Sequence, residues 1–136
     1  MELNKFYDGI DLVGRLLIAA LFLQDGWVVI HNYGGTADFL TQHGVPPLSL
    51  PLALALQVGG GLLVVLGWWT RLAALALAGF CLSTALIFHN NFGDFNEVIH
   101  FWKDLALAGG FFILLAHGAG GYSLDARGRQ RAQTRP

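Results

Sequence analysis

The amino-acid sequence predicts an all-helical integral membrane protein: a bundle of four transmembrane helices with the N and C termini in the cytoplasm. Three observations support this fold class. Hydrophobic residues make up 54% of the 136 residues and charged residues only 12%, about half the charged fraction of a soluble domain. Several apolar segments have the length that crosses a bilayer. The basic residues gather on one side of these segments, as the positive-inside rule describes.

The four predicted spans follow from the thickness of the bilayer, since a hydrocarbon core of about 30 Å requires roughly 20 mostly apolar residues per helix. The predicted spans cover about residues 10–31, 50–69, 71–89 and 97–117. Arg15 and Asp25 interrupt the first span and no clear cleavage site follows it, so we expect a retained helix rather than a signal peptide. The second and third spans are nearly continuous and should form a tight antiparallel hairpin.

The orientation follows from the basic residues. With four spans, only Lys103 lies toward the opposite side from the other basic residues, so the larger set is placed in the cytoplasm. The larger set is Lys5, Arg15, Arg71, Arg127, Arg129, Arg131 and Arg135. The loops after the first and third spans therefore face outward.

Two segments lie outside the predicted spans. In the first outer loop, Thr36 is a candidate cap for a short surface helix that ends near His43, with Gly44 as its stop. Residues 125–136 form a polar, Arg-rich tail, which we expect to be a mobile cytoplasmic end in contact with anionic lipid. Residues 1–124 are then one four-helix domain.

Small residues are frequent in the second and third spans, where they let helix backbones approach closely. They are Gly59, Gly60, Gly61, Gly67, Ala73, Ala74, Ala78 and Gly79. Two interpretations stay open: tight packing within one bundle, or a lipid-facing seam between two copies in a homo-oligomer.

Charged residues inside the spans are the most informative, because each costs on the order of 3 kcal/mol at the bilayer centre and so tends to face the bundle. Steps of three and four residues place Asp11, Arg15 and Asp25 on one face of the first span. Asp11 and Arg15 are i,i+4 neighbours near the inner interface, which predicts a local structural ion pair.

A polar pocket is predicted in the outer half of the bundle. Asp25 lies six residues before the outer end of the first span and Lys103 six residues after the outer start of the fourth. Antiparallel packing places both about 9 Å below the outer interface, so we expect them to approach each other directly or through water. The candidate pocket residues are Asp25, Lys103, His100, Gln24, Gln57, His89 and Asp104. The alternatives are a charge pair that only fixes helix register, and histidines that only sit at the headgroup level.

Other classes of function have little support in the sequence. The lone Cys81 excludes an internal disulfide and any CxxC motif, and it is expected to be a packing residue. The histidines show no metal or haem ligand spacing. The net charge of -1 argues against a nucleic-acid partner.

The order of several short motifs resembles the DoxX family of small bacterial four-helix membrane proteins, over nearly the whole chain. The resembling segments are Gly14-Arg15-Leu16-Leu17, Phe22-Leu23-Gln24-Asp25-Gly26, His43-Gly44-Val45-Pro46, Gln57-Val58-Gly59-Gly60-Gly61, Leu66-Gly67-Trp68-Trp69-Thr70-Arg71-Leu72-Ala73-Ala74, Ile87-Phe88-His89, Asn96 to Asp104, and Gly118-Ala119-Gly120-Gly121-Tyr122-Ser123-Leu124-Asp125. This chain has Gln57 where the family often has a glutamate, and His31 where it often has a lysine.

The resemblance implies a multi-pass protein of the bacterial inner membrane that is associated with redox systems. Three functions stay open. The first is a subunit that binds a quinone in the outer pocket and receives electrons from a protein partner, since no flavin or haem motif is evident. The second is a non-enzymatic anchor or scaffold for a partner enzyme. The third is passage of a small molecule or proton, which four helices accommodate least well.

Overall fold

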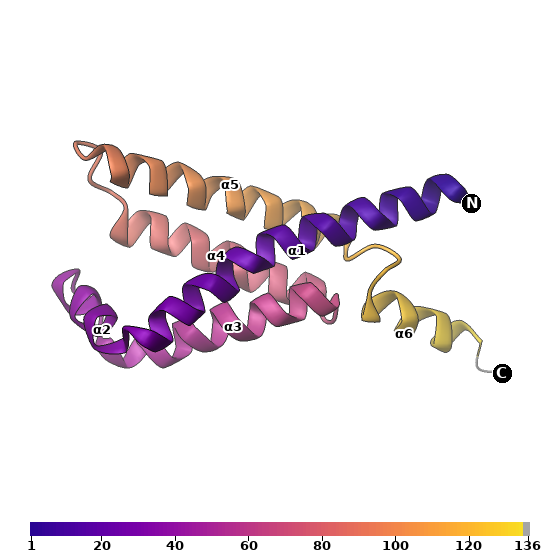
Figure 1. Ribbon diagram of the computed structural model, residues 1–136, viewed down its shortest axis with the longest axis horizontal. Coiled ribbons are helices and arrows are strands. Elements are labelled where there is room, and N and C mark those ends of the chain that lie inside the picture. The colour runs from indigo at the N-terminus through magenta and orange to yellow at the C-terminus, as the bar shows by residue number, and fades with distance from the viewer. Residues whose placement is uncertain (135–136) are drawn as a thin grey trace.

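The structure is a computed structural model that describes residues 1–134 and consists almost entirely of helices (Figure 1). The elements are α1 (Glu2–His31), α2 (Tyr33–Gln42), the short 3-10 helix η1 (Pro47–Ser49), α3 (Leu50–Leu66), α4 (Thr70–Phe88), α5 (Phe95–His117) and α6 (Leu124–Gln133). Within these residues, four helices are long and apolar enough to cross a membrane, namely α1, α4, α5 and α3 with η1. The predicted all-helical protein with four long apolar helices is therefore confirmed.

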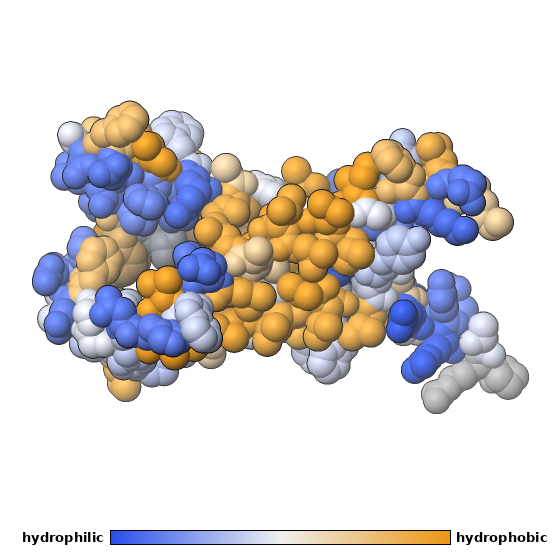
Figure 2. All heavy atoms as spheres, in the orientation of Figure 1, coloured by the Kyte–Doolittle hydropathy of each residue, from blue (hydrophilic) through white to orange (hydrophobic). Residues whose placement is uncertain are grey.

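The long helices form a bundle in which α1 packs along α3, α3 packs on α4 and α4 packs on α5. The N terminus and α6 lie at one end of the bundle, here named the terminal end, and α2 lies at the other, the α2 end (Figure 1). Figure 2 shows a broad apolar band between these two more polar ends. Large apolar side chains such as Leu17 and Leu52 are more than 70% exposed, which suits a surface in contact with lipid.

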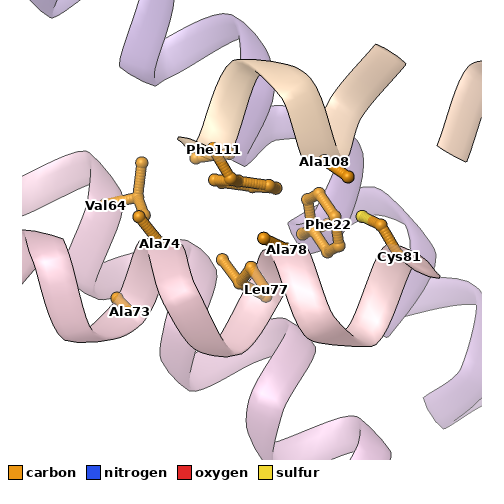
Figure 3. Close-up of a cluster of buried hydrophobic side chains, with 10 residues drawn as sticks. Phe22, Val64, Ala73, Ala74, Leu77, Ala78, Cys81, Ala108 and Phe111 are labelled. Carbon is orange, nitrogen blue, oxygen red and sulfur yellow. The ribbon is translucent and has the colours of Figure 1, made fainter. Parts of the chain in front are cut away.

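The core of the bundle is built around small residues of α4 (Figure 3). Ala74 and Ala78 are fully buried, and the rings of Phe22 from α1 and Phe111 from α5 meet edge to face with their centroids 5.3 Å apart. A Cβ atom on Gly60 would lie 3.1 Å from the side chain of Leu77, so the glycine permits a close approach of α3 and α4. These contacts favour packing within one bundle for the buried small residues.

Several helix boundaries differ from the expected ones. The first helix begins at Glu2 rather than near Ile10, and its 30 residues span about 45 Å, more than the hydrocarbon core requires. Helix α3 ends at Leu66 rather than Trp69, because Gly67 adopts a left-handed conformation with φ of 64°. Helix α2 begins at Tyr33, before Thr36, whose hydroxyl donates to the carbonyl of Asn32 instead of capping the helix.

The terminal end is closed by Arg15, whose side chain is only 2% exposed. Its Nη1 donates to the carbonyls of Val64 (3.1 Å) and Val65 (3.3 Å), and its Nη2 donates to the carbonyl of Tyr122. The carbonyls of Val64 and Val65 lie at the negative end of the α3 dipole, and the carbonyl of Tyr122 belongs to the segment between α5 and α6. The expected Asp11–Arg15 ion pair is not formed: within residues 1–134 no salt bridge of 4 Å or less joins these two side chains.

The tail was expected to be mobile, but its described part, up to residue 134, is largely helical. Ser123 caps α6 by accepting a hydrogen bond from the backbone N–H of Ala126 at 3.1 Å. Asp125 holds the helix to the bundle, since its two carboxylate oxygens accept from the backbone N–H groups of Trp69 (2.9 Å) and Thr70 (3.0 Å). Arg135 and Pro136, the last two residues of the predicted tail, lie outside the described residues.

Candidate functional site

A cavity of about 170 Å³ lies inside the half of the bundle that is nearer to α2. Helices α1, α3, α4 and α5 all contribute to its wall, and Phe39 of α2 covers it from the α2 end. The apolar part of the wall is Leu21, Phe22, Phe39, Phe80, Cys81, Phe88 and Leu107. The polar part is Asp25, Gln57, Thr84, His89, Lys103 and Asp104.

Asp104 of α5 is the most deeply placed acid of the cavity, and it is 8% exposed. Its Oδ2 accepts a hydrogen bond from the hydroxyl of Thr84 on α4 at 2.9 Å. The same oxygen lies 3.9 Å from Nε2 of His89, which follows the last residue of α4. The carboxylate therefore joins α4 to α5 and faces both a neutral donor and a titratable ring.

His89 extends this polar contact toward the α2 end. Its Nδ1 donates to Oε2 of Glu97 at 2.7 Å, which directs the other ring nitrogen, Nε2, toward Asp104. The imidazole ring also stacks on that of His100, with centroids 5.1 Å apart and planes inclined by 26°. Asp104, His89 and Glu97 thus lie in series from the buried cavity to a side chain that is 30% exposed, with a hydrogen bond between His89 and Glu97 and a separation of 3.9 Å between His89 and Asp104.

Lys103 and Asp25 face the cavity from opposite helices, α5 and α1. Lys103 Nζ lies 3.2 Å from Nδ1 of His100, to which it donates. In the described part of the chain, no nitrogen–oxygen distance of 4 Å or less joins Lys103 to Asp25 or to another acid. The two side chains therefore share one cavity, as their depth suggested, without forming a direct ion pair.

Gln57 supplies an amide in the middle of α3. Its side chain is 9% exposed, and Oε1 is buried with no hydrogen-bond partner among the residues that the structure describes. Because an unpaired buried amide costs about 1–3 kcal/mol, this oxygen is available for a donor inside the cavity.

Two of the seven candidate pocket residues lie off the cavity. Gln24 is exposed, because one step along the helix turns it about 100° away from Asp25. His100 is also exposed and reaches the site only through Lys103 and His89. His31 likewise points away, with Nδ1 placed 2.8 Å from the carbonyl of Trp27.

Thr84 and Glu97 also belong to this site, although neither was predicted from the sequence. Glu97 lies about one helical turn before His100 on the chain, so this spacing was a signal that could have placed it in the site. Thr84 sits in an apolar run, and its role depends on how α4 packs against α5. Among residues 1–134, no group of three or more His, Cys, Asp or Glu side chains is placed to hold a metal ion.

The sequence of this chain is similar to a known protein family and to two inner membrane proteins. The DoxX family model matches residues 10–90. The chain is 42% identical over 123 residues to the inner membrane protein YqjF of Escherichia coli K12, which covers 90% of this chain and 95% of that protein. It is 32% identical over 123 residues to the inner membrane protein YphA of the same organism, covering 85% and 88%. No solved structure matches the chain.

Proposed function

The chain belongs to the DoxX family of inner membrane proteins, and from this premise we propose that it is a redox-associated subunit that binds the head group of a quinone. The head group occupies the cavity between Asp25, Gln57 and Lys103, and a protein partner delivers the electrons. Both termini face the cytoplasm in this proposal, so that the cavity lies in the outer half of the membrane.

The observation that carries the proposal is the pairing of opposite hydrogen-bonding groups inside an aromatic cavity. Lys103 is a donor for a carbonyl oxygen, whereas the unpartnered Oε1 of Gln57 and the carboxylate of Asp25 are acceptors for a hydroxyl. A quinone presents carbonyl oxygens and its reduced form presents hydroxyls, so the same three side chains serve both forms. The rings of Phe22, Phe80 and Phe88 supply apolar walls.

The size of the cavity limits the ligand to a small ring. A volume of about 170 Å³ is below the roughly 300–1,000 Å³ of sites for drug-sized molecules and equals about six water molecules. A head group of one ring is therefore expected inside, with an apolar side chain left in lipid.

The polar path through His89 gives the cavity a route for protons. Bound quinone supplies two-electron redox chemistry that takes up protons on reduction. Glu97, His89 and Asp104 lie in series from the α2 end to the cavity, with a distance of 2.7 Å at the first step and 3.9 Å at the second. The ring of His89 holds its proton on Nδ1 while it donates to Glu97, and a change to the tautomer with the proton on Nε2 presents that proton to Asp104.

A scaffold function is the second candidate, favoured by α6. This Arg-rich helix is held to the bundle by Asp125 yet exposes Arg127, Arg129 and Arg131, which suits a docking element for an acidic surface of a partner enzyme. In that case the polar side chains around the cavity serve only to fix how the helices pack.

The first test compares small molecules that copurify with the protein in mild detergent. The wild type is purified beside Asp25→Asn and Lys103→Met, with Asp38→Asn and Lys5→Met as exposed controls of equal charge change. Extracts are analysed by mass spectrometry, and a short-chain ubiquinone analogue is titrated back. Quinone that is bound by the wild type and both controls but lost from both cavity variants supports the proposal. A wild type that neither carries quinone nor binds the analogue favours the scaffold.

A further inference from the structure

A second recess of about 640 Å³ lies at the terminal end, at the opposite end of the bundle from the cavity. It forms where the beginning of α4, the end of α5 and the first turns of α6 meet. The residues that matter here are Trp69, Arg71, Leu72, His117, Asp125 and Arg129. No part of the proposed quinone function uses these residues.

Cationic side chains dominate the recess. Arg71 and Arg129 come from helices far apart in the sequence, both are exposed, and within residues 1–134 neither forms an ion pair of 4 Å or less. Arg71 Nη2 donates to the carbonyl of Ala116 at 3.3 Å, which holds the guanidinium against the end of α5. His117, the last residue of α5, lines the recess beside them.

Among residues 1–134, Asp125 is the one carboxylate that lines the recess, and it already accepts hydrogen bonds. Both oxygens of Asp125 accept backbone N–H groups at the start of α4, from Trp69 and Thr70. These bonds leave the backbone amides unavailable to an incoming anion, so the two guanidinium groups must provide the binding site. Guanidinium groups are well suited to phosphate, because their planar fork matches two of its oxygens.

The surroundings of the recess indicate a lipid rather than a free anion. Trp69 and Leu72 are 61% and 58% exposed, and they lie on either side of Arg71 at the start of a membrane-spanning helix. Figure 2 shows the hydrophilic α6 beyond the end of the apolar band. Exposed tryptophan beside arginine is typical of the headgroup level of a bilayer, and basic pockets between helices bind anionic head groups there.

We infer that this recess binds an anionic phospholipid, with its phosphate between Arg71 and Arg129 and an acyl chain beside Leu72. The lipid joins α6 to α4 and α5 and so reinforces the attachment that Asp125 provides. The inference stands apart from the quinone proposal, because the two sites lie at opposite ends of the bundle.

The test uses the full chain, delipidated in a neutral detergent. It is titrated with dioctanoyl phosphatidylglycerol, with phosphatidylcholine of the same chain length, and with inorganic phosphate. Bound lipid is counted by native mass spectrometry and the melting temperature is followed. Arg71→Gln and Arg129→Gln are compared with Arg131→Gln, which removes the same charge from α6 outside the recess.

The expected result is saturable binding of phosphatidylglycerol that raises the melting temperature. Each of the two recess variants weakens this binding by about fivefold, the effect of one arginine near a lipid surface, and Arg131→Gln leaves it unchanged. Equal effects of the two lipids, equal losses in all three variants, or the same stabilisation by inorganic phosphate would each overturn the assignment. Melting temperatures without lipid establish that the variants are folded.

Discussion

The guanidinium of Arg15 donates a hydrogen bond to the backbone carbonyl of Tyr122, which lies 107 positions further along the chain. The same side chain donates to two carbonyls at the end of α3, so one residue joins α1 to two other segments at the terminal end. This geometry requires several N–H groups in one plane, which arginine provides and lysine does not.

Replacing Arg15 with lysine should therefore destabilise the bundle although the charge is kept. The ammonium cannot reach all three carbonyls, and the loss of at least one buried hydrogen bond from a charged donor lowers the free energy of unfolding by about 2 kcal/mol. Thermal unfolding in detergent measures the change. Arg127→Lys, at an exposed position on α6, should leave the melting temperature unchanged, and an equal loss in both variants would contradict the explanation.

Asp125→Asn should loosen α6 from the bundle. The neutral amide offers only one oxygen to the N–H groups of Trp69 and Thr70 and loses the favourable interaction of a negative charge with a helix N terminus. We expect a loss of about 1 kcal/mol in the free energy of unfolding and faster amide hydrogen exchange in α6. Unchanged exchange in residues 124–133 would show that other contacts hold this helix.

The stability of the wild type should also depend on Asp125 at acidic pH. Burial by itself would raise the pKa of Asp125, but hydrogen bonds from Thr70 and Trp69 outweigh it and lower the pKa below its usual value. A group with a depressed pKa stabilises the folded state above its unfolded pKa of about 4 and loses that contribution as the pH falls through the folded value. Below about pH 4 the melting temperature of the wild type should therefore fall more steeply than that of Asp125→Asn.

Gly67→Ala should be among the most damaging single changes in α3 and its cap. Gly67 has a φ of 64°, which costs a residue with a Cβ roughly 1–2 kcal/mol, and the added Cβ would collide with Arg15 Nη1 and with Ser123. Gly59→Ala in the same helix meets nothing within 4 Å and should be neutral or stabilising. The melting temperatures of the two variants test this difference. Equal melting temperatures would show that the conformation of Gly67 does not limit the stability of α3.

Asp25→Asn should leave the fold intact. Within the described residues Asp25 accepts no side-chain hydrogen bond and forms no ion pair of 4 Å or less, so removing its charge relieves a desolvation cost rather than breaking a contact. Asp104→Leu, by contrast, removes the acceptor of the hydrogen bond that the Thr84 hydroxyl donates from α4 to α5 and should cost about 1–3 kcal/mol. A melting temperature of Asp25→Asn as low as that of Asp104→Leu would indicate that Asp25 has a structural role.

The sequence predicted best those features that depend on a single helix. Apolar length predicted the membrane-spanning helices, and helical spacing directed Arg15 and Asp25 toward the bundle. The prediction that Gln24 lines the pocket was wrong, because it relied on the adjacent Asp25 in the sequence and not on the helix face of Gln24 itself.

The remaining features depend on contacts between helices, which spacing along one helix does not reveal. The partners of Arg15 are backbone carbonyls near residues 64 and 122, which carry no side-chain signal, so the nearby Asp11 appeared to be the natural partner. The attachment of α6 is a contact between Asp125 and the amides of a turn 55 positions away. Thr84 belongs to the site only through its hydrogen bond to Asp104, and the packing of α4 on α5 brings these two side chains together.

The closure of the terminal end by residues 15 and 122 has a consequence for biosynthesis. During insertion, Arg15 enters the membrane while the segment that carries Tyr122 has yet to be translated. Until that segment leaves the ribosome, the guanidinium lacks one of its three carbonyl partners. Synthesis of the segment that carries Tyr122 therefore completes the closure of the bundle, and a nascent chain that stops before Tyr122 leaves one donor group of the Arg15 guanidinium without its carbonyl.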